Sequence, residues 1–485
     1  MQPLEHFSQS LRRDDVADWI MSGLIGDGIE IDGPFGPKPL VYADYVASGR
    51  ALDQVEDFIR QKVLPYYANS HTQASYCGSY VTRLREAARG AVARMTGSGA
   101  GDSVVFTGSG STAAINRIVA LLDITRLVAQ GRRVSVLVGP YEHHSNLLPW
   151  RESGATVTEI PEGDSGGPRL DALGRTLDQA TGADLIVGAF SAASNVTGIV
   201  TEIDAVTRLL KSRGALAVWD YGCGAPYMAM DMKTGTDAAK DAIVFSPHKF
   251  PGGPGASGVM IVRNAVVSRC TPSLPGGGTV SFVSPWGHTY SDRIEVREEA
   301  GTPNVIGDIR VALAMLVKEA LGQDWLDARQ KHLRQRAERI WSQNPRLDML
   351  GLAQSNALPI FSFRVRDGNG GYVHQQFFTR LLSDLAGIQA RGGCACAGSY
   401  AHRLLHLDQS KSQKIERAIA EGCELDKPGW VRLNLSALMA DEKADHVIQS
   451  VDALAFSASD YQSRYREDPA TARFFPVDMI QETLS

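Results

Sequence analysis

The sequence predicts an α/β protein with a large domain built on a mainly parallel sheet and a smaller α+β domain. Between residues 40 and 305, short continuous apolar runs alternate with amphipathic helical segments. That alternation is typical of parallel strands covered by helices on both faces. The chain has 485 residues, of which 44% are hydrophobic and 21% are charged. This length suits two or three domains, and this composition suits a well-filled globular core.

The large domain is predicted to follow a lead-in at residues 1–39, which has a helical pattern at 16–21 and a Gly/Pro-rich stretch at 26–39. Five apolar runs predict buried strands at 104–106, 134–138, 185–190, 216–219 and 242–245. Helical patterns lie between them at 113–122 and 203–213. We expect this domain to span residues 40–305.

The smaller domain is expected at residues 306–456, after a turn-rich link at 301–308. Its predicted elements are one long helix from Ile309 to the region of Trp341, strands at 358–365 and 431–435, and helices at 373–385 and 442–456. The polar residues 457–485 are expected to form a C-terminal extension.

Composition excludes several functional classes. The net charge of −5 gives no basic surface for nucleic acid or an anionic membrane. No apolar run approaches the roughly 20 residues of a membrane span, and the N-terminus lacks a signal-peptide pattern, so we expect a cytoplasmic protein. The six cysteines are too sparse for a disulfide framework, and Cys394 and Cys396 have no second ligand pair at a zinc spacing, so no metal site is predicted.

Lys249 gives the sharpest local signal. The segment Ser246-Pro-His-Lys follows an apolar strand and precedes a rigid Gly/Pro turn, which is a poor place for a solvated charge. Desolvation and nearby positive charge favour the deprotonated amine that forms an imine. Ser246 and His248 could both donate to a phosphate. Taken alone, Lys249 would more often be a surface lysine.

Asp220 closes the preceding apolar strand, where a buried carboxylate needs a cation as partner. The protonated nitrogen of a pyridine ring is such a partner. An aspartate after a strand is also common as a turn or capping residue. The spacing to Lys249, one strand–helix unit, favours the cofactor role.

A glycine-rich turn, Thr107-Gly-Ser-Gly-Ser-Thr, follows another strand and opens a helix. Backbone N–H groups and hydroxyls at a helix start form an anion site. The turn alone is weak evidence, but the absence of a following Lys-Ser/Thr disfavours a nucleoside triphosphate loop.

These pieces resemble, in order and spacing, the fold-type I pyridoxal 5′-phosphate enzymes of aminotransferase class V, the group of cysteine desulfurases and selenocysteine lyases. The resemblance runs from Tyr42-Ala-Asp-Tyr-Val-Ala-Ser to Arg432-Leu-Asn-Leu, about four-fifths of the chain. Its most specific segments are Glu142-His-His-Ser-Asn, Ser194-Asn-Val-Thr-Gly, Ser246-Pro-His-Lys and Gly301-Thr-Pro-Asn.

The resemblance implies that Lys249 carries pyridoxal 5′-phosphate covalently and that Asp220 pairs with its ring nitrogen. His143 would stack on the ring and serve in proton transfer, and Asn195 would bind the ring hydroxyl or the substrate. Ser111, Thr112, Ser246 and His248 would hold the phosphate. Thr302 would reach the phosphate of a neighbouring subunit, since family members are dimers.

The same resemblance implies a substrate site. Arg432 would clamp the substrate carboxylate with its planar fork, although a structural ion pair is the alternative. The segment Ala390-Arg-Gly-Gly-Cys-Ala-Cys places the family's nucleophile on Cys396, with Arg391 beside it. A cysteine desulfurase would then convert L-cysteine to L-alanine, leave a persulfide on Cys396 and pass sulfur to an acceptor, which could be a protein.

Three departures from the family pattern put the substrate in question. Cys223 replaces a glutamine after the ring-binding aspartate, the Asp-Asn-Ala-Ala-Ser opening is Asp44-Tyr-Val-Ala-Ser, and Cys394 with Ala395 replaces two histidines. One alternative is therefore another enzyme of the group, a C–S lyase, epimerase or aminotransferase, for which Cys396 is dispensable. A second is a non-catalytic sulfur carrier or scaffold, which the retained Lys249 disfavours.

Overall fold

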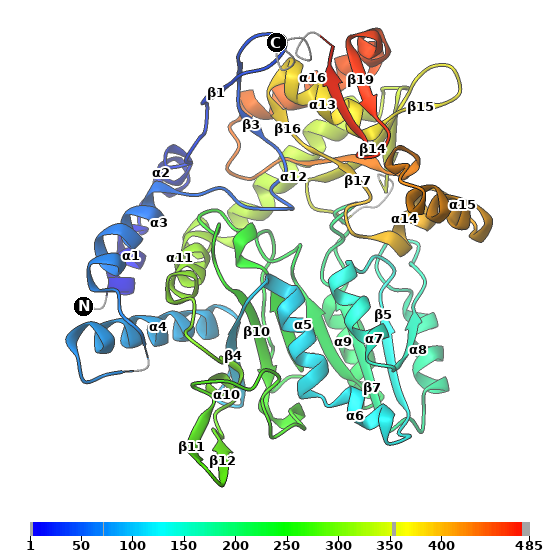
Figure 1. The fold of residues 1–485 in the computed structure, drawn as a ribbon. Helices are drawn as coiled ribbons and strands as arrows, with labels where there is room; N and C mark the ends of the chain where they lie inside the picture. Colours follow the sequence, from blue (N-terminus) through cyan, green and yellow to red (C-terminus); the bar gives the residue numbers. More distant parts are fainter. Residues whose placement is uncertain (1–2, 71, 352–355, 478–485) are drawn as a thin grey trace. The chain divides into compact units, whose positions relative to one another are not determined.

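The computed structural model describes residues 3–70, 72–351 and 356–477, which divide into two compact units. The first unit holds residues up to 25, 48–194 and 200–326, and the second holds 26–47, 195–199 and the chain from 327 onwards. Figure 1 traces both units along the chain.

The first unit is built on a seven-stranded sheet (Figure 1). In spatial order its strands are β4 (Asp102–Thr107), β10 (Gly258–Arg263), β9 (Ala242–Phe245), β8 (Leu216–Asp220), β7 (Leu185–Ser191), β5 (Val134–Val138) and β6 (Thr156–Glu159). Only β10 runs antiparallel to its neighbours in this sheet. The five predicted strands and the mainly parallel sheet are thus confirmed.

Helices and one hairpin complete the first unit. The helices are α1 (Pro3–Ser10), α2 (Val16–Ser22), α3 (Asp53–Phe58), α4 (Tyr76–Met95), α5 (Gly110–Leu121), α6 (Ile124–Ala129), α7 (Leu148–Glu152), α8 (Leu170–Gln179), α9 (Ile203–Ser212), α10 (Ile294–Glu298) and α11 (Val305–Leu321). The hairpin consists of β11 (Val280–Ser284) and β12 (Gly287–Tyr290). Helix α5 packs on β9 and β10 through buried Ile115 and Ile118. In the described part of the chain, no helix is long and apolar enough to cross a membrane.

The second unit contains an antiparallel sheet with β13 (Leu347–Leu350), β14 (Ile360–Arg366), β18 (Trp430–Asn434) and β17 (Arg391–Gly393), and β15 (Tyr372–Val373) pairs with β14. Two smaller pairs are β1 (Glu30–Ile31) with β2 (Lys38–Pro39), and β3 (Val41–Tyr42) with β16 (Ile388–Gln389). The helices are most of α12 (Gln323–Trp341), α13 (Gln375–Ala386), α14 (Gly398–Leu404), α15 (Gln409–Ala420) and α16 (Asp441–Ser457). The α+β class is confirmed.

The single long helix predicted from Ile309 to Trp341 is wrong. Two helices, α11 and α12, meet at Gly322, which has φ +79° and closes α11 by donating its N–H to the Glu319 carbonyl. A left-handed residue cannot continue a right-handed helix, and glycine takes that conformation at no steric cost.

The C-terminal segment also differs from a polar extension. The hairpin of β19 (Tyr465–Asp468) and β20 (Arg473–Pro476) packs on α13. The Tyr465 hydroxyl donates to Asp384 at 2.7 Å, and its ring lies 5.3 Å from that of Phe377. Residues 478–485 of the predicted extension lie outside the described residues.

The boundaries of the two units also differ from the predicted domain boundaries. The unit containing the large sheet continues through α11 to residue 326, beyond the predicted limit at 305. Residues 26–47, expected to divide between lead-in and large domain, belong to the second unit, because β3 pairs with β16 there.

Candidate active site

Lys249 lies in the first unit, in a short 3-10 turn (Pro247–Lys249) directly after β9. The turn is tightly packed, because a Cβ on Gly253 would lie 2.0 Å from the Pro247 carbonyl oxygen. The carbonyl of His248 accepts the Gly49 N–H at 2.8 Å. Lys249 is half-buried, which suits an amine that must lose its proton to react.

His248 lies beside this lysine with its ring partly buried. Burial, and then the Lys249 charge, lower its pKa from the usual 6.5 to about 4. His248 is therefore mainly neutral at pH 7, and the N–H of its ring can donate a hydrogen bond to a phosphate.

Asp220 is the last residue of β8 and is 5% exposed. Its Oδ1 accepts the Gly222 N–H at 2.7 Å. Burial raises the pKa of this carboxyl, and hydrogen bonding and the Lys249 charge oppose the rise. A buried carboxyl of this kind is stabilised in its charged form by a further cation.

The predicted phosphate site lies at the start of α5. The Ser111 N–H donates to Ser246 Oγ at 2.9 Å, and the two hydroxyl oxygens are 3.1 Å apart. Gly110 has φ +56°, and a Cβ there would meet Ser246 Oγ at 2.5 Å. Thr112 is exposed and shares a hydrogen bond of 2.6 Å with Ser145. N–H groups at a helix start, with two hydroxyls, make an anion site.

His143 is held by Ser145, whose backbone N–H donates to His143 Nδ1 at 3.1 Å. An accepting Nδ1 places the hydrogen of the neutral ring on Nε2. The adjoining Glu142 is buried and receives hydrogen bonds from Ser191, Asn146 and Gly139. Burial is the main cause that raises the pKa of Glu142 to about 7.

Thr302 is exposed in the bend before α11. Its predicted contact is with a second subunit, so the role stays a prediction. Cys223 is buried, and its Sγ lies 3.7 Å from the Ser194 carbonyl oxygen as a weak donor.

In the second unit, Cys396 is exposed in a tight turn between β17 and α14. The Ala397 N–H donates to the Cys394 carbonyl at 3.1 Å, and the two central residues, Ala395 and Cys396, have φ of +53° and +54°. Positive φ at both central positions defines a type I′ turn, which usually needs glycine or asparagine. The Asn195 side-chain amide donates to the Ala395 carbonyl at 2.8 Å and holds the turn in place.

The two predicted substrate-site arginines share one carboxylate. Arg391 Nε donates to Asp44 Oδ2 at 2.9 Å, and Arg432 Nη2 donates to Asp44 Oδ1 at 3.0 Å. Arg432 is 4% exposed, and its Nη1 donates to the Asn195 carbonyl at 3.1 Å. Its Nε is buried without a hydrogen-bond partner. A buried guanidinium with an unused donor is suited to an anionic ligand.

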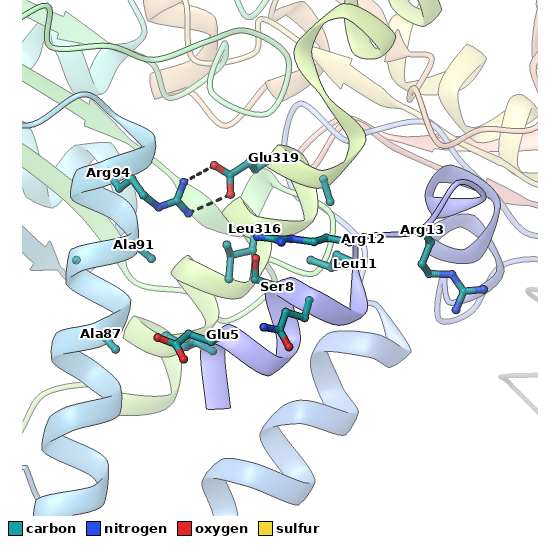
Figure 2. Close-up of a pocket in the computed structure, with 14 residues that line it drawn as sticks. Glu5, Ser8, Leu11, Arg12, Arg13, Ala87, Ala91, Arg94, Leu316 and Glu319 are labelled. Carbon is teal, nitrogen blue, oxygen red and sulfur yellow. Dashed lines mark hydrogen bonds and ion pairs between the residues drawn. The ribbon is translucent and has the colours of Figure 1, made fainter. Parts of the chain in front are cut away.

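A separate groove of about 970 Å³ lies between α1, α4 and α11 of the first unit (Figure 2). Arg94 donates two hydrogen bonds to the Glu319 carboxylate, and this ion pair lies along one side of the groove. Leu11 and Leu316 line the groove with apolar surface. None of the residues predicted for catalysis lines this groove. In the described residues, no group of three or more His, Cys, Asp and Glu is placed to share a metal ion.

Residues 41–418 match the family model of aminotransferase class V. The chain belongs to this family. Among curated proteins, it is 32% identical to a probable cysteine desulfurase of Vibrio cholerae over 74% of this chain and 85% of that protein. It is 27% identical to a probable cysteine desulfurase of Halalkalibacterium halodurans over 76% of this chain and 86% of that one.

Solved structures of similar fold include the apo cysteine desulfurase of Thermococcus onnurineus, with a TM-score of 0.71 and 24% identity over 86% of this chain and 94% of that one. The cysteine desulfurase CsdA of Escherichia coli gives a TM-score of 0.66 and 23% identity over 85% and 94%. The predicted fold type I is therefore confirmed for this class V chain.

Class V enzymes use pyridoxal 5′-phosphate, and the first unit fits that group in three respects. The start of α5 with Ser111 and Ser246 is an anion site. Asp220 is a buried carboxyl with a raised pKa, and a cationic ring nitrogen beside it would stabilise its charged form. Lys249 follows the neighbouring strand in a rigid turn.

Two acidic residues of the candidate site received no role of their own from the sequence. Glu142 lies in a quoted motif, but the four donors that surround it come from three other positions. From the sequence, Asp44 was noted only as part of the altered segment Asp44-Tyr-Val-Ala-Ser, while in the structure its carboxylate binds both Arg391 and Arg432. The signal for Asp44 in the sequence was a carboxylate two residues after the short strand β3.

Proposed function

We propose that this chain is a cysteine desulfurase that converts L-cysteine to L-alanine and takes the sulfur as a persulfide on Cys396. The carrying observation is an exposed Cys396 in a turn held by Asn195, in the same unit as the buried Arg432. The class V relatives named cysteine desulfurases support the same activity.

The first unit would bind the cofactor and move protons. Ser111, Ser246 and the N-terminus of α5 would hold the phosphate, and Asp220 would pair with the ring nitrogen. Pyridoxal 5′-phosphate on Lys249 supplies an electron sink that weakens the bonds to the substrate's Cα. The Lys249 amine would remove the proton from Cα, and His143 would assist with the proton on Nε2.

The second unit would orient the substrate. Arg432 would bind the α-carboxylate through its unused donors, including the unpartnered Nε. Asp44 would keep the guanidinium fixed, since it holds Arg432 and Arg391 at once. A guanidinium that is already fixed loses less conformational entropy when the substrate binds.

Sulfur transfer requires a thiolate. The Cys396 thiolate would attack the substrate sulfur, an S–S bond would form, and the substrate's C–S bond would break. Protons would then complete alanine, and the sulfur would remain on Cys396. Exposure of Cys396 on this unit suits delivery to a sulfur-acceptor protein.

Two further proposals concern the assembly of the protein and the contact made by Thr302. We propose a homodimer in which the exposed Thr302 reaches the partner's phosphate. A cytoplasmic location stays a prediction. Chromatography with light scattering tests the dimer, and a Thr302→Ala variant with weaker cofactor retention tests the contact.

The deciding experiment mixes purified protein with L-cysteine and an excess of a thiol reductant, and follows sulfide, alanine and the visible spectrum. Equal amounts of sulfide and alanine are expected. Sulfide with pyruvate and ammonia would instead identify a C–S lyase. A yellow protein without product would keep the cofactor and overturn the substrate.

A further inference from the structure

Two free thiols flank one residue of the turn that carries Cys396. Cys394 is half-buried, Cys396 is exposed, and Ala395 separates them. Cys394 provides the carbonyl that closes the turn, so both cysteines belong to one hydrogen-bonded unit. The third cysteine of this unit, Cys423, follows α15 and lies outside the turn.

The backbone of Ala395 sets the separation of the two cysteine Cα atoms. Ala395 has φ +53° in a turn closed by the Ala397 N–H, which places it in the left-handed region. By helix geometry, the Cα atoms on either side of such a residue are about 5.4 Å apart, which lies within the roughly 4.4–6.8 Å of disulfides. An extended Ala395 would place them about 7 Å apart, beyond that range.

We propose that Cys394 is a resolving thiol that releases the sulfur carried by Cys396 as sulfide. This inference rests on the proposed desulfurase function, because that reaction loads Cys396. It adds an intramolecular route by which sulfur leaves, in competition with transfer to an acceptor protein.

The step balances within the chain. The Cys394 thiolate attacks the Cys396 Sγ, the Cys394–Cys396 S–S bond forms, and the bond from Sγ to the outer sulfur breaks. The outer sulfur leaves as hydrosulfide and takes up the proton that Cys394 lost. The outer sulfur is reduced to sulfide while the two cysteines become a disulfide, so no external oxidant is needed. An external dithiol then reduces the disulfide for the next turnover.

The turn favours this exchange on two counts. Non-glycine residues at two consecutive left-handed positions are unfavourable, and the structure holds them through the Asn195 amide and the closing N–H bond. The turn that sets this short Cα separation is therefore present before sulfur arrives. The disulfide would lie in a turn whose Cys396 is exposed, where an external dithiol can reach and reduce it.

The test is a single turnover without reductant. Enzyme and L-cysteine are mixed at equal concentration, alanine and sulfide are measured, and the alkylated protein is mapped by peptide mass. Wild type is expected to release sulfide with alanine and to carry a Cys394–Cys396 disulfide, seen as the loss of two hydrogens. Cys394→Ser is expected to form alanine without the sulfide burst and to keep one extra sulfur on Cys396. Cys423→Ser, which removes another half-buried thiol of the unit, is the matched control and should match wild type.

Wild-type protein that retains a stable persulfide, or Cys394→Ser that releases sulfide as wild type does, would overturn the inference. Absence of alanine would instead count against the desulfurase function. A second arm separates these failures by loading Cys396 chemically with inorganic tetrasulfide. The disulfide is expected in wild type and a lasting persulfide in Cys394→Ser, and a lasting persulfide in both would refute the resolving role independently of activity.

Discussion

Arg391 and Arg432 lie directly opposite each other in the antiparallel pair of β17 and β18, and the carboxylate of Asp44 binds both. Like charges in that arrangement repel. Asp44 converts the repulsion into a three-membered ion cluster, and the pairing of β3 with β16 brings it there. The cluster therefore both stabilises the second unit and orients the proposed substrate clamp.

Replacing Asp44 by Asn should weaken folding and substrate binding together. It leaves the buried Arg432 without its counter-charge, and losing one partner of a buried pair costs about 3 kcal/mol. Urea unfolding should show that loss, and the KM for L-cysteine should rise more than kcat falls. Asp171→Asn, which removes the exposed partner of Arg175, should change neither quantity measurably. A normal KM in Asp44→Asn would separate Asp44 from the clamp.

Gly110→Ala should weaken cofactor binding. The new Cβ would lie 2.5 Å from Ser246 Oγ and disturb the anion site at the start of α5. We expect at least a tenfold loss of affinity for pyridoxal 5′-phosphate, which corresponds to about 1.4 kcal/mol. Spectroscopic titration of the apoprotein measures it. Gly214→Ala imposes a similar left-handed strain, φ +70° against +56°, with no atom within 4 Å, so it should lose stability but keep its affinity.

The sequence predicts the sheet of the first unit well because each strand carries its own signal. The run from Val134 to Val138 is apolar throughout, and such a run has few alternatives to a buried strand. The break between α11 and α12 at Gly322 was not predicted, because one glycine weakens a helical pattern by only about 1 kcal/mol. A glycine in the sequence does not by itself indicate a positive φ. Asp44 and Arg432 are 388 positions apart, so no local pattern links them.

Tyr465→Ala should destabilise the second unit, although this residue lies in the segment predicted as an extension. Its ring is 8% exposed, packs on Phe377, and its hydroxyl donates to Asp384. Truncating a buried aromatic residue costs about 3 kcal/mol. Phe456→Ala, which removes a ring that is 55% exposed, should cost far less. Equal midpoints of denaturant unfolding for the two variants would mean that the hairpin of β19 and β20 adds nothing to the core.

Glu142 should make stability fall as the pH rises from about 4.5 to 7. Its pKa is raised from 4.5 to about 7 in the folded protein, mainly by burial. In that window the folded state keeps a proton that the unfolded chain releases, so each rise in pH favours unfolding. The shift of about 2.5 units corresponds to about 3 kcal/mol, fully lost above pH 7. Urea titrations at several pH values should show this slope in wild type and its absence in Glu142→Gln. Parallel curves would show that folding does not raise the pKa of Glu142.

Lys249→Ala and Cys396→Ala should fail in different ways, which separates the cofactor from the sulfur chemistry. Without the Lys249 amine no covalent attachment can form, so the visible band of the bound cofactor should be lost or shifted, together with all product. Cys396 lies in the other unit, exposed in its turn, and no cofactor-binding role falls on it. Cys396→Ala should therefore keep the band while sulfide release from L-cysteine falls by at least about a hundredfold, as expected when a covalent nucleophile is removed. Sulfide release at the wild-type rate from Cys396→Ala would rule out the persulfide and point to direct C–S lysis. An unchanged band with full activity in Lys249→Ala would remove the lysine from the mechanism altogether.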